Sequence, residues 1–167
     1  MIITVWRHGE AGRAVSDRRR ELTGQGTDDI GFGCSRFHDS CHERGIPHPE
    51  LICHSPWVRT TQTADIINSA FSHARMQVME ALRPGSDCLA VDAALASLQA
   101  DRSPPRHLVL VSHQPLVSRL VEHYLGEVGT VPSQTPGGLA TLEMDSPGRG
   151  CARLLFWAMP PQYRAEL

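Results

Sequence analysis

The chain lacks the features that place a protein in a membrane, in an oxidising compartment or on nucleic acid. It has no apolar run near the roughly 20 residues that a membrane helix needs, and its first apolar stretch is too short for a signal-peptide core. Its five cysteines are scattered and include no Cys-x-x-Cys pair, which is typical of free thiols in a reducing compartment. A formal net charge of −2 provides no overall basic field for nucleic acid or anionic membranes. We therefore expect a cytoplasmic protein that binds neither.

What the chain does have is a repeated alternation of strand-like and helix-like segments. Its 167 residues and 41% hydrophobic content suit one domain, spanning residues 1–167. The expected strands are Ile2–Trp6, Leu51–His54, Met76–Met79, His107–Ser112, Leu139–Glu143 and Arg153–Ala158, and the expected helices are Thr23–Glu43, Trp57–Phe71, Asp87–Ala100 and Pro115–Leu125. This order predicts a three-layer α/β fold with a mostly parallel sheet and helices on both faces. The last two strands follow each other without a helix, which predicts an antiparallel edge.

Histidine or arginine follows three of the expected strands. Arg7-His8-Gly9 comes after the first strand, Arg59 lies shortly after the second, and Ser112-His113-Gln114 ends the strand that begins at His107. The carboxyl ends of parallel strands meet at one edge of a sheet, where open α/β sheets bind their ligands. We therefore expect these segments to form one cationic pocket, in which the flexible Gly9 backbone approaches the ligand closely.

These residue types suit phosphoryl transfer. The transferred group spreads its negative charge over three oxygens, which fixed donors must stabilise. Arg7 and Arg59 can each donate two hydrogen bonds to those oxygens and carry permanent charges. A neutral imidazole at His8 can attack phosphorus in line and form a covalent intermediate, while His113 supplies a further donor.

The same motifs resemble those of the histidine phosphatase superfamily, which has the phosphoglycerate mutase-like fold. The resemblance rests on Arg7-His8-Gly9, on the Ser-Pro-x-x-Arg-x-x-Gln-Thr segment that begins at Ser55, and on the late Ser112-His113 pair, in the family's order. The short length and the segments Arg20–Thr23, Leu82–Gly85 and Ser112–Val117 are similar to the SixA-type phosphohistidine phosphatases. The motifs extend over nearly the whole chain.

The resemblance implies a hydrolase and a role for each matching residue. His8 would be the nucleophile that becomes phosphorylated, with Arg7, Arg59 and His113 completing the phosphate site. It also implies a mechanism without a metal or another cofactor. The further substrate-binding residues are expected to be Gly9, Gln114 and, at the rim of the pocket, Arg20.

The sequence offers only weak candidates for a proton donor. Many members of the larger family use a carboxylic acid to protonate a departing alkoxide, and here Glu80 is the local candidate, with Asp87 as an alternative. An imidazole that leaves from phosphohistidine is far less basic than an alkoxide and has less need of an acid. The weak acid signal therefore favours a phosphohistidine substrate.

The chain is too short for the large insertions that cover the substrate in bigger family members, so we expect an open pocket in a monomer. Such a pocket admits a phosphohistidine on a protein partner, for example a histidine phosphotransfer domain, and small phosphorylated substrates as well. Two alternatives remain open: a small-molecule phosphomonoesterase with Glu80 as its acid, and a phosphate- or phosphoprotein-binding module without turnover.

Two other clusters have simpler interpretations. Cys34, His38 and Cys41 lie on one face of the expected first helix as packing residues, while His42 turns partly away, so we expect no metal there. The run Arg18–Arg20 indicates a solvated loop that helps to attract an acidic partner, rather than a nucleic-acid site.

Overall fold

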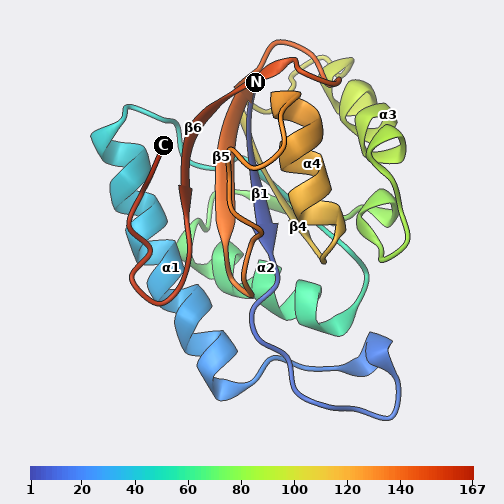
Figure 1. Cartoon of the computed structure of the whole chain (residues 1–167), viewed down its shortest axis with the longest axis vertical. Coiled ribbons are helices and arrows are strands. Elements are labelled where there is room, and N and C mark those ends of the chain that lie inside the picture. Colours follow the sequence, from blue (N-terminus) through green and yellow to red (C-terminus); the bar gives the residue numbers. More distant parts are fainter.

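Six strands form one sheet around β1 (Ile2–Arg7) and β4 (His107–Ser112), which lie side by side at its centre (Figure 1). The computed structural model describes all residues 1–167. The remaining strands are β2 (Leu51–His54), β3 (Arg75–Val78), β5 (Leu139–Met144) and β6 (Ala152–Ala158). The strand order is β3-β2-β4-β1-β5-β6. The first four strands of this order are parallel, whereas β5 runs antiparallel to β1 and β6 antiparallel to β5.

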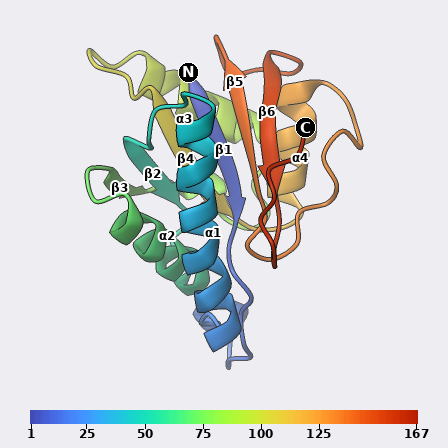
Figure 2. The same cartoon turned by 90° about the vertical axis from the view of Figure 1, so that its left-hand side faces the viewer.

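Helices cover both faces of the sheet. They are α1 (Gly24–Glu43), α2 (Val58–Ala70), α3 (Cys88–Gln99) and α4 (Leu116–Leu125), and two short 3-10 turns, η1 (Asp17–Arg19) and η2 (Glu80–Leu82), accompany them. Figure 2 shows α1 and α2 in front of the sheet, and these helices share one hydrophobic core with it. The helices α3 and α4 share a second core with the opposite face. The molecule therefore has three layers.

The central strands are mostly apolar because both of their faces are covered. Ile3 and Val5 of β1 belong to the core beneath α3 and α4, whereas Trp6 belongs to the core beneath α1 and α2. Residues of β4 alternate between the same two cores. This packing fixes the register of the two strands, which places Arg7 opposite Ser112 at their carboxyl ends.

The predicted fold class is confirmed, and each expected element is present with its ends within one residue of the predicted ones. Thr23 caps α1, since its side-chain oxygen accepts a hydrogen bond from the Gly26 N–H at 2.9 Å. The strands β5 and β6 form the expected antiparallel edge. The strand β3 forms the other edge, and all of its residues are exposed. None of the helices combines the length and the apolar character needed to span a membrane.

The chain after β1 lies directly on the start of α1. A Cβ on Gly26 would overlap the carbonyl oxygen of Glu10 and lie 2.8 Å from its nitrogen. Gly9 faces the same helix, because its own Cβ would lie 2.9 Å from the carbonyl oxygen of Gly26. The space where a Gly9 side chain would be is filled by α1, so the glycine is needed for this packing.

This close approach predicts opposite effects for two glycine substitutions in α1. Gly26→Ala should lower the free energy of unfolding by about 1–3 kcal/mol, because the added methyl group overpacks the contact with Glu10. Gly31→Ala is the matched control, since no atom lies within 4 Å of the position of its Cβ. It should raise the free energy of unfolding by roughly 0.5–1 kcal/mol, because alanine is the better helix former. Urea unfolding followed by circular dichroism measures both values, and equal effects would contradict the close approach.

Candidate active site

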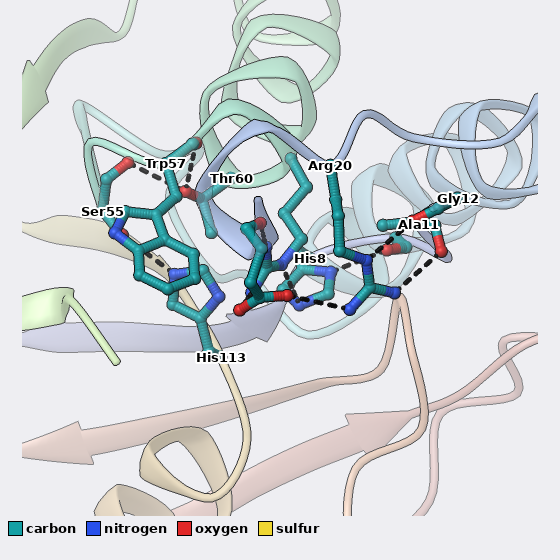
Figure 3. Close-up of polar contacts among 11 residues, drawn as sticks. His8, Ala11, Gly12, Arg20, Ser55, Trp57, Thr60 and His113 are labelled. Atoms are coloured by element: carbon teal, nitrogen blue, oxygen red, sulfur yellow. Dashed lines mark hydrogen bonds and ion pairs between the residues drawn. The ribbon is translucent and has the colours of Figure 1, made fainter. Parts of the chain in front are cut away.

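The predicted segments meet at the carboxyl edge of the sheet. His8 follows β1, His113 follows β4 and Ser55 follows β2, and these three strands are neighbours in the sheet. Arg59 lies in the first turn of α2 and contacts His8 from there. Figure 3 shows His8 and His113 next to each other, with their ring centroids 5.1 Å apart. The parallel strands therefore bring residues from three distant parts of the chain into one cluster.

His8 is held as a neutral imidazole with the proton on Nδ1. The Nε of Arg59 can only donate, so its 3.0 Å contact with Nε2 of His8 requires Nε2 to accept. Nδ1 then carries the proton and donates it to the carbonyl oxygen of Gly9 at 2.7 Å. Burial lowers the pKa of His8 to about 4, opposed by the Gly9 hydrogen bond and helped by the charges of Arg59 and Arg7. At neutral pH Nε2 therefore carries no proton, and its lone pair can act as a nucleophile once the N–H of Arg59 turns away from it.

Trp57 positions both Arg59 and His113, although the sequence did not single it out. Arg59 is only 4% exposed, and its guanidinium carbon lies 4.8 Å from the centroid of the Trp57 ring, a cation–π arrangement. The same ring packs edge-on against His113, with centroids 5.2 Å apart. The available signal was its place between Ser55 and Arg59 in the motif, but spacing alone does not reveal a contact with His113.

His113 presents a ring nitrogen that has no partner. Its Nε2 is hydrogen-bonded to Oγ of Ser55 at 2.9 Å, whereas Nδ1 is buried without a partner. Burial, followed by the charges of His8 and Arg59, lowers the pKa of His113 to about 3, so the ring is neutral at pH 7. When the Ser55 hydroxyl donates to Nε2, the proton of the neutral ring sits on Nδ1. A buried donor without a partner is costly, and an anionic oxygen at this place would satisfy it.

Arg7 is anchored by a loop that precedes β5. Its Nη1 donates to the carbonyl oxygen of Gln134 at 2.8 Å, while its Nε is buried without a partner. Gln134 is itself fixed, because its Nε2 donates to the carbonyl oxygen of Val5 at 3.0 Å. Burial and then the charge of Arg59 lower the pKa of Arg7. Arg7 is thus a second cation close to His8, and its Nε–H has no hydrogen-bond partner.

Asp17, a carboxylate that the sequence did not single out, lies against Arg59. Arg59 donates from Nη1 to the carbonyl oxygen of Asp17 at 2.6 Å and from Nη2 to its Oδ2 at 3.3 Å. Arg20 donates to Oδ1 of Asp17 at 3.1 Å and also reaches the carbonyl oxygens of Ala11 and Gly12 (Figure 3). Arg20 is thus connected to Arg59 through Asp17. The i,i+3 spacing of Asp17 and Arg20 was the only signal, and ordinary surface pairs have the same spacing.

Gly9 and Gln114 use their donors for local structure rather than for the site. The N–H of Gly9 donates to Oγ1 of Thr63 at 3.2 Å, so Gly9 serves the site through its carbonyl oxygen, which orients His8. The side-chain amide of Gln114 donates to Ser118 at 2.7 Å and to the carbonyl oxygen of Gln134 at 2.9 Å. Both donors predicted to bind substrate are therefore taken by the protein itself.

The two candidate acids are also engaged. Glu80 lies in η2, where its 65% exposed side chain pairs with Nε of Arg83 at 3.1 Å. Asp87 caps α3, because its Oδ1 accepts the Ala90 N–H at 2.9 Å. Neither carboxylate is hydrogen-bonded to a residue of the cluster around His8.

The cysteines of α1 belong to its packing face. Cys34 and Cys41 are buried in the core that α1 and α2 share with the sheet, whereas the expected packing role of His38 was wrong, because its side chain is exposed. His, Cys, Asp and Glu side chains form no group of three or more that could hold a metal ion.

This architecture is the phosphoglycerate mutase-like fold of the histidine phosphatases, as the sequence resemblance predicted. The solved structure of the protein histidine phosphatase SixA complexed with tungstate is 25% identical, with a TM-score of 0.75 over 96% of this chain and 97% of that one. An Agrobacterium tumefaciens protein assigned as SixA is 22% identical, with a TM-score of 0.76 over 95% and 98%. A mycobacterial glucosyl-3-phosphoglycerate phosphatase is 17% identical, with a TM-score of 0.69 over 95% and 99%. No family model and no curated protein matches the chain.

The protonation state of His8 can be measured directly. We expect long-range ¹H–¹⁵N correlation spectra at pH 7 to show a neutral His8 with the proton on Nδ1. Because burial disfavours the charged ring, His8 should remain neutral as the pH falls through 6.5 and should gain its proton only near pH 4. The His8→Ala variant assigns the signal. A titration midpoint at about pH 6.5, the pKa of a free histidine, would contradict the assignment of His8 as a buried neutral ring.

Proposed function

We propose that the protein is a phosphatase that removes phosphate from phosphohistidine on a partner protein, through a phosphorylated intermediate at His8. One observation supports this function above all: the unprotonated Nε2 of His8 lies 3.0 Å from Nε of Arg59, beside the unpartnered Nδ1 of His113. A nucleophile, a permanent cation and a free donor in one place are what phosphoryl transfer requires. The SixA phosphohistidine phosphatase among the structural neighbours supports the same substrate class.

In the first step, the lone pair on Nε2 of His8 attacks phosphorus. The substrate's ring carries a proton on its other nitrogen, so when the nitrogen–phosphorus bond breaks, its electron pair stays on a departing neutral imidazole. The ring of His8 becomes cationic as the new bond forms, which strengthens the hydrogen bond from Nδ1 to the carbonyl oxygen of Gly9. Once Nε2 is no longer an acceptor, the Nε–H of Arg59 is available for a phosphoryl oxygen.

In the second step, water attacks the phosphorus of phospho-His8. The nitrogen–phosphorus bond breaks, the lone pair returns to Nε2, and inorganic phosphate leaves. Charge on the phosphoryl oxygens is stabilised in both steps by the guanidinium groups of Arg7 and Arg59 and by the Nδ1–H of His113. The fold already holds these side chains near His8, and the phosphoryl group replaces the contacts that Arg59 makes with His8 and with the Asp17 carboxylate.

The positions of the carboxylates support an imidazole leaving group. Glu80 pairs with Arg83 and Asp87 caps α3, so both carboxylates are engaged by other groups of the protein. Asp17 is close, but its ion pairs with Arg20 and Arg59 keep it in the carboxylate form at neutral pH. A departing alkoxide needs an acid, whereas a departing imidazole is much less basic.

The surface beside the site suits an acidic protein partner. Arg13, Arg18 and Arg19 are exposed on the segment that carries Asp17, and none of them is in an ion pair. Their charge would attract an acidic surface around the phosphohistidine, such as that of an acidic histidine phosphotransfer domain. We further propose that the protein acts as a monomer in the cytoplasm, where its five unpaired cysteines would stay reduced.

A direct assay tests this function. Incubation with a phosphorylated histidine phosphotransfer domain should release inorganic phosphate, and His8→Ala should reduce the rate by about 10³-fold or more, because the nucleophile is lost. His73→Ala is the matched control, because His73 is exposed and lies before the amino end of β3, whereas the site lies at the carboxyl ends of the strands. It should release phosphate at the wild-type rate. Equal release by wild type and His8→Ala would overturn the proposal.

The same assay separates the alternatives when alkyl and aryl phosphates are added to it. Fast hydrolysis of alkyl phosphates that Glu80→Gln abolishes would favour a small-molecule phosphomonoesterase instead. Phosphate binding without turnover of any substrate would favour a binding module. The proposed phosphohistidine phosphatase predicts that phosphohistidine is preferred and that Glu80→Gln leaves its hydrolysis unchanged.

A further inference from the structure

We propose that Asp17 is an internal counter-anion, which competes with the phosphoryl group for Arg59 and so sets how tightly the site holds phosphate. Such a role presupposes the phosphate site of the proposed function. It adds a residue that determines the affinity of that site for its anion, in a segment outside the three motifs that carry the chemistry.

The contacts of Arg59 show the competition. The guanidinium edge formed by Nε and Nη2 is one of the two edges that can donate two parallel hydrogen bonds to a single anion. In this structure the edge is divided, because Nε donates to His8 at 3.0 Å and Nη2 donates to Oδ2 of Asp17 at 3.3 Å. The remaining nitrogen, Nη1, donates to the carbonyl oxygen of Asp17 at 2.6 Å. A phosphoryl group held by both Nε and Nη2 must take the place of the Asp17 carboxylate.

The charges explain why a carboxylate lies against Arg59. Arg59 is buried, and the charges of Arg7 and Arg20 lie close enough to act on the same group, His8. Cations gathered in this way repel one another, and a buried cation without a partner is strongly unfavourable. The carboxylate of Asp17 receives hydrogen bonds from Arg20 and Arg59 together. It therefore compensates part of this charge while no phosphate is bound.

The Asp17 carboxylate can move away from Arg59 without disturbing the fold. Its side chain is 55% exposed, so it can turn toward water without unpacking a core. Arg20 also holds the segment independently, through hydrogen bonds of 2.7 Å to the carbonyl oxygen of Gly12 and 2.9 Å to that of Ala11. A phosphate dianion carries more charge than the carboxylate and can displace it. When phosphate is the product, the returning carboxylate assists its release.

Calorimetric titration with inorganic phosphate tests this role without turnover. Asp17→Asn keeps the size of the side chain and removes its charge, so we expect about fivefold tighter phosphate binding, the effect of losing one partly exposed competing ion pair. Asp101→Asn is the matched control, because Asp101 is exposed and precedes the amino end of β4, whereas the site lies at the carboxyl ends of the strands. The affinity of this control variant for phosphate should equal that of the wild type. Asp17→Glu keeps the charge and should stay close to the wild-type value.

The outcomes separate this inference from the proposed function. If the wild type binds phosphate and Asp17→Asn binds it equally or more weakly, Asp17 is no counter-anion, while the phosphate site stands. If none of the proteins binds phosphate, the counter-anion and the proposed function both fail.

Steady-state kinetics with a phosphorylated histidine phosphotransfer domain provide a second readout. A competing carboxylate predicts that Asp17→Asn lowers KM and strengthens inhibition by the product phosphate. A purely structural role for the segment predicts the opposite shift in both quantities, because a disordered Arg59 would bind phosphate less well.

Discussion

A histidine can act as a nucleophile among arginines only while it stays unprotonated, and the rest of the site depends on this condition. Burial of the ring is the main cause of this condition, and the charges of Arg59 and Arg7 add to it. Two hydrogen bonds then fix which nitrogen is free of the proton, because Nε2 accepts from Arg59 and Nδ1 donates to the carbonyl oxygen of Gly9. The chain contains no lysine, so all 16 of its cationic Lys and Arg positions are arginines. Arginine keeps its proton in proteins, so the site retains its positive charge while His8 remains neutral.

The sheet makes this arrangement rigid. The carboxyl ends of β1, β2 and β4 are neighbours, and two hydrophobic cores fix these strands from above and below. The chain beyond β1 is then held against α1 by the close approach of Gly26 and Glu10. The groups around His8 are therefore positioned before any anion arrives, which is the condition under which electrostatic stabilisation is most effective.

The sequence predicted the elements and the central residues well, because both are encoded locally. Apolar runs mark strands that are buried on both faces, and His8, Arg59 and His113 are found because they follow such runs. Asp17 and Gln134 were missed because their roles come from contacts across the chain: Asp17 meets Arg59 over 42 positions, and Gln134 meets Arg7 over 127. No spacing pattern in the sequence indicates contacts between residues so far apart in the chain. Gly9 and Gln114 were assigned to substrate for the same reason, since Thr63 and the carbonyl oxygen of Gln134, which accept from them, come from other segments.

The central claim is that phosphate passes through Nε2 of His8. The most direct test is to mix the protein with a phosphorylated histidine phosphotransfer domain, to quench the reaction within one turnover in base, where phosphohistidine survives, and to map the phosphate by mass spectrometry and ³¹P NMR. The account predicts a transient phosphate on Nε2 of His8, formed before free phosphate is released. Release of phosphate with no phosphorylated protein at any time, or a phosphate on His113 instead, would contradict it.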